Sequence, residues 1–392
     1  MVHGVPASNE APGKAEINPL DNELRESRES LTHTDDFRPL FLTLEPDTMI
    51  IIKTFLFRMS YLKKATIKDV AQLAKVSIST VSNALNGVNV VKPQTKARIL
   101  SAAHQLNYSP NLMGKQLRSG QTNMIGVFTD SVAGPYFYQL IETISQAAAA
   151  KNYGLSVTLA NNHTALMNSL LGNTCDGAII FDHRVDDRDL EHLAGQEIPA
   201  VMLDRPVSGD HLSSIVFDSF NESYLATQYL LQLGHQRIGY LAGYDNNRDN
   251  HERFTGFQRA ILSAGLSLED MVVLKGLFEE QAAYDAVKTY LTTETAQPVT
   301  AFLAGNDLSA IGAIKAIQAA GHQVPEDYSV IGFDDIEIAS YFDPTLTTVR
   351  NPIAKQGQLA VTELIRLLTT KQWGQQQVLP GDLKIRASTG KH

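Results

Sequence analysis

Short apolar runs alternate with longer amphipathic segments through most of the chain, from Met124 onward. Runs typical of buried strands, separated by helical patterns, predict an open parallel α/β sheet. The strand-like runs are Met124–Phe128, Leu155–Leu159, Gly177–Phe181, Ala200–Leu203, Ile215–Phe217, Ile238–Leu241, Ala301–Leu303 and Val330–Gly332. The helical segments include Tyr136–Lys151, Tyr224–Leu233, Phe254–Ala264, Gln281–Leu291, Leu308–Ala320 and Ile353–Leu368. Because one compact sheet usually holds about four to six strands, we expect two lobes.

Upstream of this region, residues 66–85 predict two short helices joined by a tight turn at Lys75-Val76. Thr66 is suited to cap the first helix together with Asp69, whose carboxylate can bond back, and Ser77 is suited to cap the second. A third helix is expected to open at Lys92-Pro93, because proline suits the first helical position. The apolar residues expected to face inward are Val70, Leu73 and Ala74, then Val81 and Leu85, then Ile99, Ala102, Ala103 and Leu106.

The outward face of the second helix carries side chains that are small or end in an amide. They are Ile78, Ser79, Thr80, Ser82 and Asn83. Such side chains suit close approach to base edges in a major groove. The alternative is an ordinary helical hairpin in a larger core, but so few large apolar residues would make a poor core piece. We therefore favour a DNA-reading hairpin.

Charge is distributed unevenly along the chain, which has a net charge of -9. Residues 59–120 hold nine Lys and Arg against the single acid Asp69, whereas residues 1–58 and 121–392 are both net acidic. A small basic module on an acidic body indicates a polyanionic partner that is confined to the module. The lone cysteine, Cys175, allows no disulfide within the chain, which fits a reducing cytoplasm.

Several ordered motifs in and after the hairpin carry a family resemblance. They are Thr66-Ile-Lys-Asp-Val-Ala, Val76-Ser, Thr80-Val-Ser82, Leu85-Asn86-Gly87 and Leu106-Asn-Tyr108-Ser-Pro110-Asn111. They resemble the headpiece of the LacI/GalR family of bacterial repressors, and the resemblance covers about residues 63–390. It implies an α/β protein with a two-lobed effector domain like the periplasmic binding proteins, an N-terminal all-α helix-turn-helix headpiece and a homodimeric assembly.

Residues 1–48 are polar and acidic with no sustained period, which predicts disorder. We therefore interpret residues 1–58 as a disordered or misassigned extension, with the hypothesis that Met59, just before the first helix, is the true start. The resemblance suggests the other domain boundaries. Residues 59–108 would form the headpiece, 109–121 a hinge helix and linker, and 122–392 the effector-binding and dimerisation domain. Within that domain, the N-lobe would span about 122–218 plus 351–377, and the C-lobe about 219–350 plus 378–392.

Contacts to double-stranded operator DNA are implied by the same resemblance. They fall on Thr66, Ser77, Ile78, Ser79, Thr80, Ser82, Asn83, Asn86, Tyr108, Asn111, Lys115, Leu117 and Arg118. Leu117 would wedge between base pairs and kink the operator. Asn83 departs from the arginine of many members, and an amide prefers adenine or a phosphate. Gly114 would weaken the hinge helix by about 1 kcal/mol relative to alanine.

Polar residues follow several strand-like runs, where ligands of such sheets bind. The resemblance assigns effector contacts to Asp204, Arg253, Asn306 and Asp334, and Asp130 holds an equivalent position. Tyr136 and Phe137 are suited to stack on a sugar face or to close a cleft. For Asp307 and Asp335 we expect helix caps instead.

The resemblance, together with the weak hinge, implies a sugar-responsive repressor of a carbohydrate-utilisation operon, with a sugar or sugar phosphate between the lobes controlling hinge-helix order. One alternative is a global carbon-catabolite regulator with a phosphocarrier protein as corepressor; another is the solute-binding protein of a transporter. We expect no enzyme, no cofactor and no metal site, since no catalytic constellation or ligand spacing is found. His235 is interpreted as structural. Residues 49–57 are too short to span a membrane.

Overall fold

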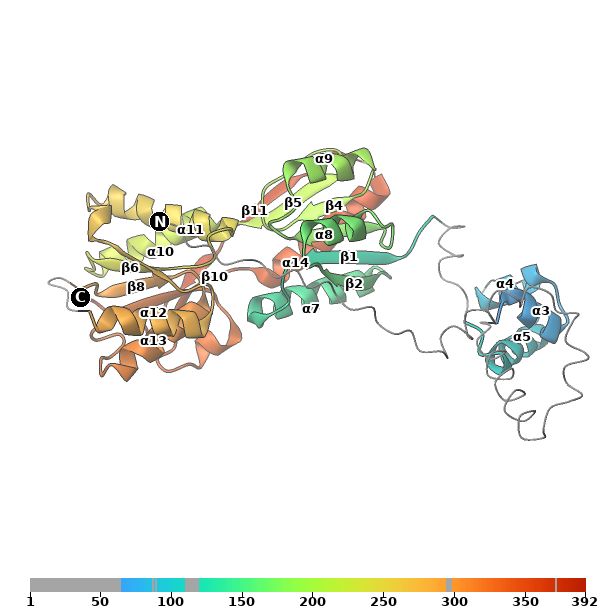
Figure 1. Ribbon diagram of the computed structural model, residues 1–392, viewed down its shortest axis with the longest axis horizontal. Helices are drawn as coiled ribbons and strands as arrows, with labels where there is room; N and C mark the ends of the chain where they lie inside the picture. The colour runs from blue at the N-terminus through green and yellow to red at the C-terminus, as the bar shows by residue number, and fades with distance from the viewer. Residues whose placement is uncertain (1–64, 87, 89, 110–119, 294–297, 371) are drawn as a thin grey trace, which may run out of the picture. The chain divides into compact units, whose positions relative to one another are not determined.

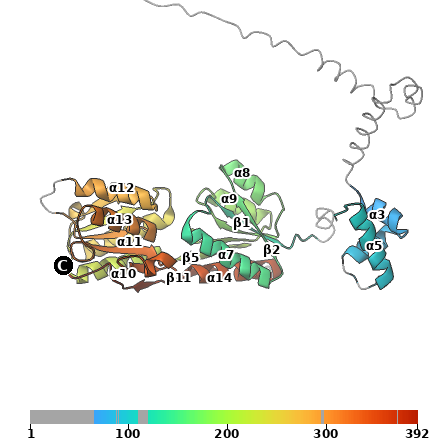
Figure 2. The ribbon, with the colours of Figure 1, turned by 90° about the horizontal axis from the view of Figure 1, so that it is seen from below.

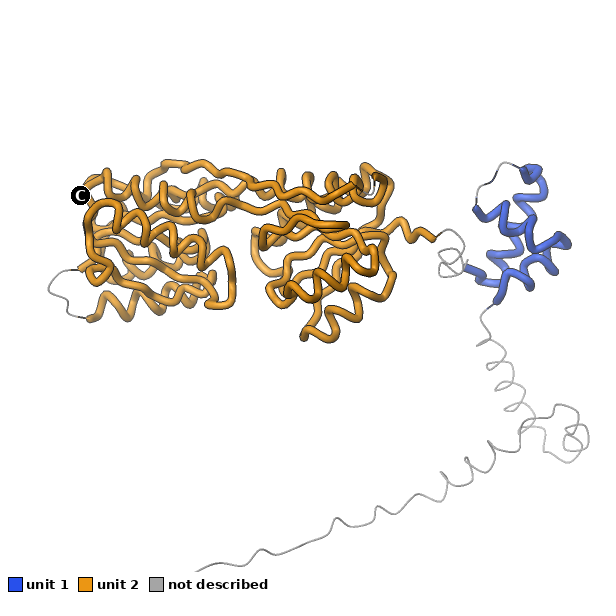
Figure 3. Tube along the Cα trace, turned by 90° about the horizontal axis from the view of Figure 1, so that it is seen from above, with its two compact units in different colours: residues 1–112 blue, residues 113–392 orange. Residues whose placement is uncertain are grey.

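The computed structural model describes residues 65–86, 88, 90–109, 120–293, 298–370 and 372–392. The chain divides into two compact units, residues 1–112 and 113–392 (Figure 3). Among the described residues, no helix is both long and apolar enough to cross a bilayer.

Unit 1 packs three helices, α3 (Ile67–Ala74), α4 (Ile78–Leu85) and α5 (Pro93–Gln105), around a small core. The Asp69 carboxylate accepts from the Thr66 backbone N–H at 2.8 Å, and the Ser77 hydroxyl accepts from the Thr80 N–H at 3.2 Å. Lys75 makes the turn between the first two helices with a φ of 50°. These helices, their caps and the turn confirm the pattern predicted for this region.

One core position of unit 1 differs from the prediction. Leu73 is 46% exposed, and Ala71 is buried beside Val70 and Ala74. The helix α3 contacts both α4 and α5. We attribute the difference to this double packing, because a small side chain allows helices to approach closely whereas leucine at the seam would hold them apart.

The strands of unit 2 form two six-stranded sheets in its described part. The first sheet has the order β11 (Gln376–Leu379), β5 (Leu212–Phe217), β4 (Ala200–Met202), β3 (Gly177–Phe181), β1 (Met124–Thr129), β2 (Gly154–Leu159), and its pairs are parallel. The second has the order β12 (Asp382–Lys384), β10 (Thr347–Arg350), β9 (Ser329–Asp334), β8 (Ala301–Ala304), β6 (Ile238–Ala242), β7 (Val272–Lys275). Only β12 runs antiparallel to its neighbour among these strands. The two parallel sheets confirm the predicted pair of lobes.

Helices cover both faces of each sheet. They are α7 (Gly134–Ala150), α8 (His163–Leu170), α9 (Asp187–Gly195) and α14 (Ile353–Thr370) on the first sheet, and α10 (Ser219–Gln232), α11 (Arg248–Ser263), α12 (Glu280–Leu291) and α13 (Asp307–Ala319) on the second. Figure 1 shows α10 and α11 on one side of the second sheet and α12 and α13 on the other, and Figure 2 shows α7 beside α14. Neighbouring strand residues point to opposite faces, so Phe302 packs under α12 and α13 whereas Leu303 packs under α10 and α11.

The chain crosses between the sheets three times, after β5, after β10 and after β11. The last crossing follows Leu379, so the lobe boundary expected at residue 377 falls inside β11. The sequence patterns did not reveal β7, β10, β11, α8 or α9. These strands are only four residues long and α8 and α9 are short, so each shows too little periodicity to stand out.

Candidate functional site

A cavity of about 340 Å³ lies between the two sheets of unit 2, at the carboxyl ends of their strands. All seven residues that the sequence assigned to an effector site line it: Asp130, Tyr136, Phe137, Asp204, Arg253, Asn306 and Asp334. Four come from the first lobe, three of them around β1 and α7 and one after β4, and three belong to the second lobe. The fold therefore brings together residues that are more than 200 positions apart in the sequence.

Arg253 is held in the wall of this cavity by its surroundings. The side chain is 5% exposed, its Nη1 donates to the Gly305 carbonyl at 2.5 Å, and its guanidinium lies 4.1 Å from the centre of the Phe333 ring. Gly256, one turn later in α11, lets α11 press against the backbone of α10, because a Cβ there would lie 2.2 Å from the Phe220 carbonyl oxygen. The segment Arg253-Phe254-Thr255-Gly256-Phe257 thus places a rigid cation, the Arg253 guanidinium, at the cavity.

Two carboxylates from opposite lobes line the cavity, and each has one buried oxygen. Asp204 Oδ1 and Asp334 Oδ1 have no hydrogen-bond partner among the described residues, and Asp334 Oδ1 lies 3.6 Å from Arg253 Nη2. Burial raises the pKa of each carboxyl to about 6, although Arg205 and Arg253 respectively act in the opposite direction. Buried acceptors without partners are costly, so this site is suited to a ligand that donates hydrogen bonds.

Asn306 lines the cavity, but both ends of its amide are already engaged. Its Oδ1 accepts from the Ser309 N–H at 2.9 Å and caps α13, and its Nδ2 donates to the Phe278 carbonyl at 3.0 Å. The prediction that Asp307 would be the cap is wrong. The Asp307 carboxylate is buried and accepts from the Ile336 N–H at 2.8 Å and the Thr348 hydroxyl at 2.5 Å.

Asp335 is not a helix cap either. Its carboxylate accepts from Arg350 Nε at 2.7 Å and Arg386 Nη2 at 2.6 Å. Burial opposes ionisation here, but these two hydrogen bonds hold the pKa of Asp335 below its usual range. The residue ties the end of β9 to β10 and to the C-terminal segment, an arrangement that the sequence around position 335 could not reveal.

Aromatic rings form the apolar part of the cavity wall. Tyr136 and Phe137 meet edge to face at 5.3 Å between centroids, and Phe137 meets Phe181 in the same way at 5.4 Å. The Tyr136 hydroxyl donates to Gln356 Oε1 at 3.2 Å, and Phe278 contributes to the wall from the second lobe. The aromatic pair expected at the cleft is therefore in position to meet a ring-shaped ligand.

Sequence reasoning missed Asp249, which also lines the cavity and accepts from the Ser219 hydroxyl at 2.7 Å. It lies four residues before Arg253, on the same face of α11. Helical periodicity would have found it had the start of α11 been placed at Arg248 rather than at Phe254. His183 was missed as well, and its imidazole lies 3.2 Å from Asp130 Oδ2.

His235 is buried in the second lobe and does not line the cavity. Its ring nitrogens contact the hydroxyl groups of Thr300 at 2.8 Å and Ser329 at 2.9 Å, and burial lowers its pKa. These contacts agree with the structural role that was expected for this residue.

The described residues assigned to DNA contact lie on unit 1. Ile78, 45% exposed, and Ser79 are on the open face of α4, and Asn83 is half-buried there. Thr66, Ser77, Thr80, Ser82 and Asn86 take part in local hydrogen bonds at the ends of α3 and α4, and Tyr108 packs against the core. Asn111, Lys115, Leu117 and Arg118, together with Gly114, lie outside the described residues.

Comparison with known proteins adds two family matches. Residues 66–111 match the family described as bacterial regulatory proteins, lacI family, and residues 227–389 match the periplasmic binding protein-like domain. The HTH-type transcriptional repressor PurR of Haemophilus influenzae is 34% identical over 320 residues, which are 80% of this chain and 94% of that protein.

Two solved structures share the fold. The lac repressor dimer bound to operator and the anti-inducer ONPF matches with a TM-score of 0.71 and 29% identity, over 84% of this chain and 100% of the other. A LacI family transcriptional regulator from Enterococcus faecium with bound ribose matches with a TM-score of 0.62 and 29% identity, over 69% and 99%.

Proposed function

The chain belongs to the lacI family of bacterial regulatory proteins and is a DNA-binding transcriptional repressor, and we propose that its effector is an uncharged sugar held between the lobes of unit 2. The observation that carries the proposal is the pair of buried oxygens, Asp204 Oδ1 and Asp334 Oδ1, that have no hydrogen-bond partner among the described residues. Sugar hydroxyls donate hydrogen bonds, and one ligand that meets both oxygens joins the two lobes.

The charge of the cavity selects between a sugar and a sugar phosphate. Its described lining holds six carboxyl groups, Asp130, Asp204, Asp249, Glu279, Asp307 and Asp334, but only two arginines, Arg248 and Arg253. A phosphate offers no donor to the unpartnered oxygens and is repelled by the surplus of carboxylates. The solved regulator with bound ribose shows that this fold can hold an uncharged sugar.

A screen with matched pairs tests this proposal. Full-length protein would be titrated by calorimetry with ribose, glucose and galactose, with their phosphorylated forms, and with purine bases. We expect a neutral sugar to bind and to change the affinity for operator DNA, and its phosphorylated form to bind at least tenfold more weakly. Binding of only the phosphorylated sugars, or only the purine bases, would refute the proposal.

We also propose that a homodimer presents two headpieces to a near-palindromic operator in the cytoplasm, as the operator-bound lac repressor is a dimer in its solved structure. The nine Lys and Arg of residues 59–120 support a strong electrostatic component. Operator affinity should therefore fall by several powers of ten as salt rises from about 50 to about 200 mM. An affinity that ignores salt would contradict this role of the headpiece.

The coupling of effector to operator is proposed to run through residues 109–121. The support is the sequence resemblance and the presence of Gly114, since glycine weakens a helix by about 1 kcal/mol. Leu117→Ala should lower operator affinity at least tenfold and leave effector binding unchanged. Unchanged operator affinity would show that Leu117 does not wedge between base pairs of the operator.

A further inference from the structure

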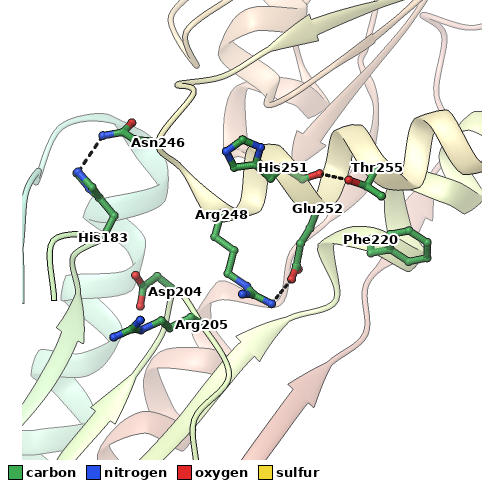
Figure 4. A pocket seen from close by; sticks show the side chains of 9 residues that line it. All are labelled: His183, Asp204, Arg205, Phe220, Asn246, Arg248, His251, Glu252 and Thr255. Atoms are coloured by element: carbon green, nitrogen blue, oxygen red, sulfur yellow. Dashed lines mark hydrogen bonds and ion pairs between the residues drawn. The ribbon is translucent and has the colours of Figure 1, made fainter. Parts of the chain in front are cut away.

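We propose that the effector cleft continues into a second compartment that takes the second unit of a disaccharide or glycoside; this inference rests on the proposed sugar response. The compartment has a volume of about 550 Å³ and lies beside the outward face of α11 (Figure 4). His251, Glu252 and Thr255 of α11 form one side, and Asp204 and Arg205 form the other.

The two cavities adjoin. Three residues, His183, Asp204 and Arg248, line both of them. A sugar that meets Asp204 and Asp334 in the effector cavity therefore lies next to the opening of the second compartment. The effector cavity alone, at about 340 Å³, is close to the lower end of the volumes of ligand sites, which run from about 300 to about 1,000 Å³. The second compartment extends the site well beyond the space that a single sugar ring fills.

The wall between the cavities offers a donor beside an acceptor. Arg205 Nε is buried and has no hydrogen-bond partner among the described residues, as is the case for Asp204 Oδ1. The rest of the Arg205 guanidinium is fixed, because Nη1 donates to Asp187 at 3.1 Å and Nη2 donates to the Val185 carbonyl at 2.6 Å. One sugar hydroxyl can accept from Nε and donate to a carboxylate at the same time.

The remaining charges of the compartment are balanced. Arg248 Nη2 lies 2.6 Å from Glu252 Oε1, so this pair neutralises itself along α11. Phe220, at the far end of the compartment in Figure 4, contributes an aromatic ring. A mixture of polar groups, paired charges and one ring suits an uncharged polyhydroxylated ligand better than a phosphate or a peptide.

A pair of matched variants tests the compartment. Thr255 and Thr289 are both exposed helical threonines whose hydroxyl donates to the carbonyl four residues earlier, at 2.7 and 2.8 Å. Thr255 lines the compartment, whereas Thr289, on α12, is not among the described residues that line either cavity. Thr255→Trp places a large ring at the wall of the compartment, and Thr289→Trp adds the same bulk elsewhere. Phe220→Ala serves as a second test that adds no bulk.

Full-length wild type and variants would be titrated with maltose, cellobiose, sucrose, trehalose and lactose, and with their component monosaccharides. We expect one disaccharide to bind wild type at least tenfold tighter than its components. Thr255→Trp should lose at least tenfold of that affinity and Phe220→Ala at least threefold, while Thr289→Trp and all monosaccharide affinities stay within twofold. The unfolding midpoint without ligand verifies that each variant is folded.

Two results separate the inference from the proposed function. Monosaccharides that bind as tightly as disaccharides, or a Thr255→Trp variant with wild-type disaccharide affinity, overturn the second compartment and leave the sugar response standing. A wild type that binds none of these sugars overturns both.

Discussion

The imidazole Nε2 of His183 lies 2.8 Å from the side-chain nitrogen of Asn246, and this contact joins the two lobes of unit 2 beside the cleft (Figure 4). His183 follows β3 of the first sheet, and Asn246 follows β6 of the second. The other ring nitrogen lies 3.2 Å from Asp130 Oδ2. A neutral ring that donates to Asp130 and accepts from Asn246 satisfies both contacts, so His183 acts as a bridge.

Loss of this bridge should weaken effector binding. The proposed effector meets both lobes, and a contact that keeps them together favours the binding arrangement. Asn246→Ala removes one partly exposed hydrogen bond worth about 1 kcal/mol, which corresponds to about fivefold in affinity. Calorimetric titration with the sugar that the screen identifies measures this loss of affinity. In the matched double variant, adding Asn246→Ala to His183→Ala should cost nothing more, and two fully additive losses would contradict a direct bridge.

Asp334→Asn should weaken effector binding about tenfold, because hydrogen bonds to a charged acceptor exceed neutral ones by about 1 kcal/mol or more. The substitution keeps the backbone intact, since Asp334 has a φ of 105° and asparagine tolerates positive φ about as well as aspartate. Asp285→Asn is the control, because Asp285 is an exposed carboxylate on α12. Equal effector affinity in wild type and Asp334→Asn, measured by the same titration, would exclude Asp334 from the site.

Effector binding should depend on pH between about 5 and 7. Burial raises the pKa of Asp204 and of Asp334 to about 6, and sugar hydroxyls donate to the ionised form. At pH 5 each carboxyl is about one-tenth ionised, so affinity should fall about tenfold or more from its value at pH 7.5. Affinity that is flat over this range would contradict the role of the carboxylates.

The same pKa values give the opposite trend for the stability of the ligand-free protein. Because the folded pKa of Asp334 lies above the usual value near 4, its contribution is fully present below about pH 4 and is lost as pH rises through about 6. Relative to Asp334→Asn, wild type should therefore lose stability over this window. Urea unfolding at pH 4.5 and pH 7.5 measures the difference in the free energy of unfolding between the two proteins. If wild type became more stable relative to Asp334→Asn as the pH rises, the raised pKa of Asp334 would be wrong.

In unit 1, Asp69→Ala should loosen α3. The Asp69 carboxylate accepts from both the backbone N–H and the hydroxyl of Thr66, and loss of a helix cap costs about 1 kcal/mol. Hydrogen exchange of the α3 amides in the full chain should accelerate about fivefold. Gln94→Ala, at an exposed position of α5, is the control. Unchanged exchange in α3 would show that the cap contributes nothing to the helix.

Local features of the sequence predicted much of this architecture. Capping at Thr66 and Ser77, the turn at Lys75 and the alternation of strands and helices depend on residues close together in the chain. Ligands of parallel sheets bind beyond the carboxyl ends of the strands, which is where Asp204 and Asp334 were expected, but their assignment to one effector site came from the family resemblance. The predictions of caps, turn and alternating elements succeeded because periodicity and short-range hydrogen bonds depend on neighbouring residues.

Tertiary structure decided the roles of residues whose partners lie far away. The choice between Asn306 and Asp307 as the cap of α13 depended on Ile336 and Thr348, which bind the Asp307 carboxylate. The role of Asp335 as a hydrogen-bonded carboxylate, and not a helix cap, was decided in part by Arg386, 51 residues later. The place of Asp249 at the effector cavity and the second compartment depend on α11 lying opposite residues of the first lobe that line the same cavities. The sequence by itself determined the longer helices, most of the buried strands and the strand ends at which polar groups gather. Only packing decided which of those groups are buried, paired or left open to a ligand, because that depends on distances between segments that local patterns do not encode.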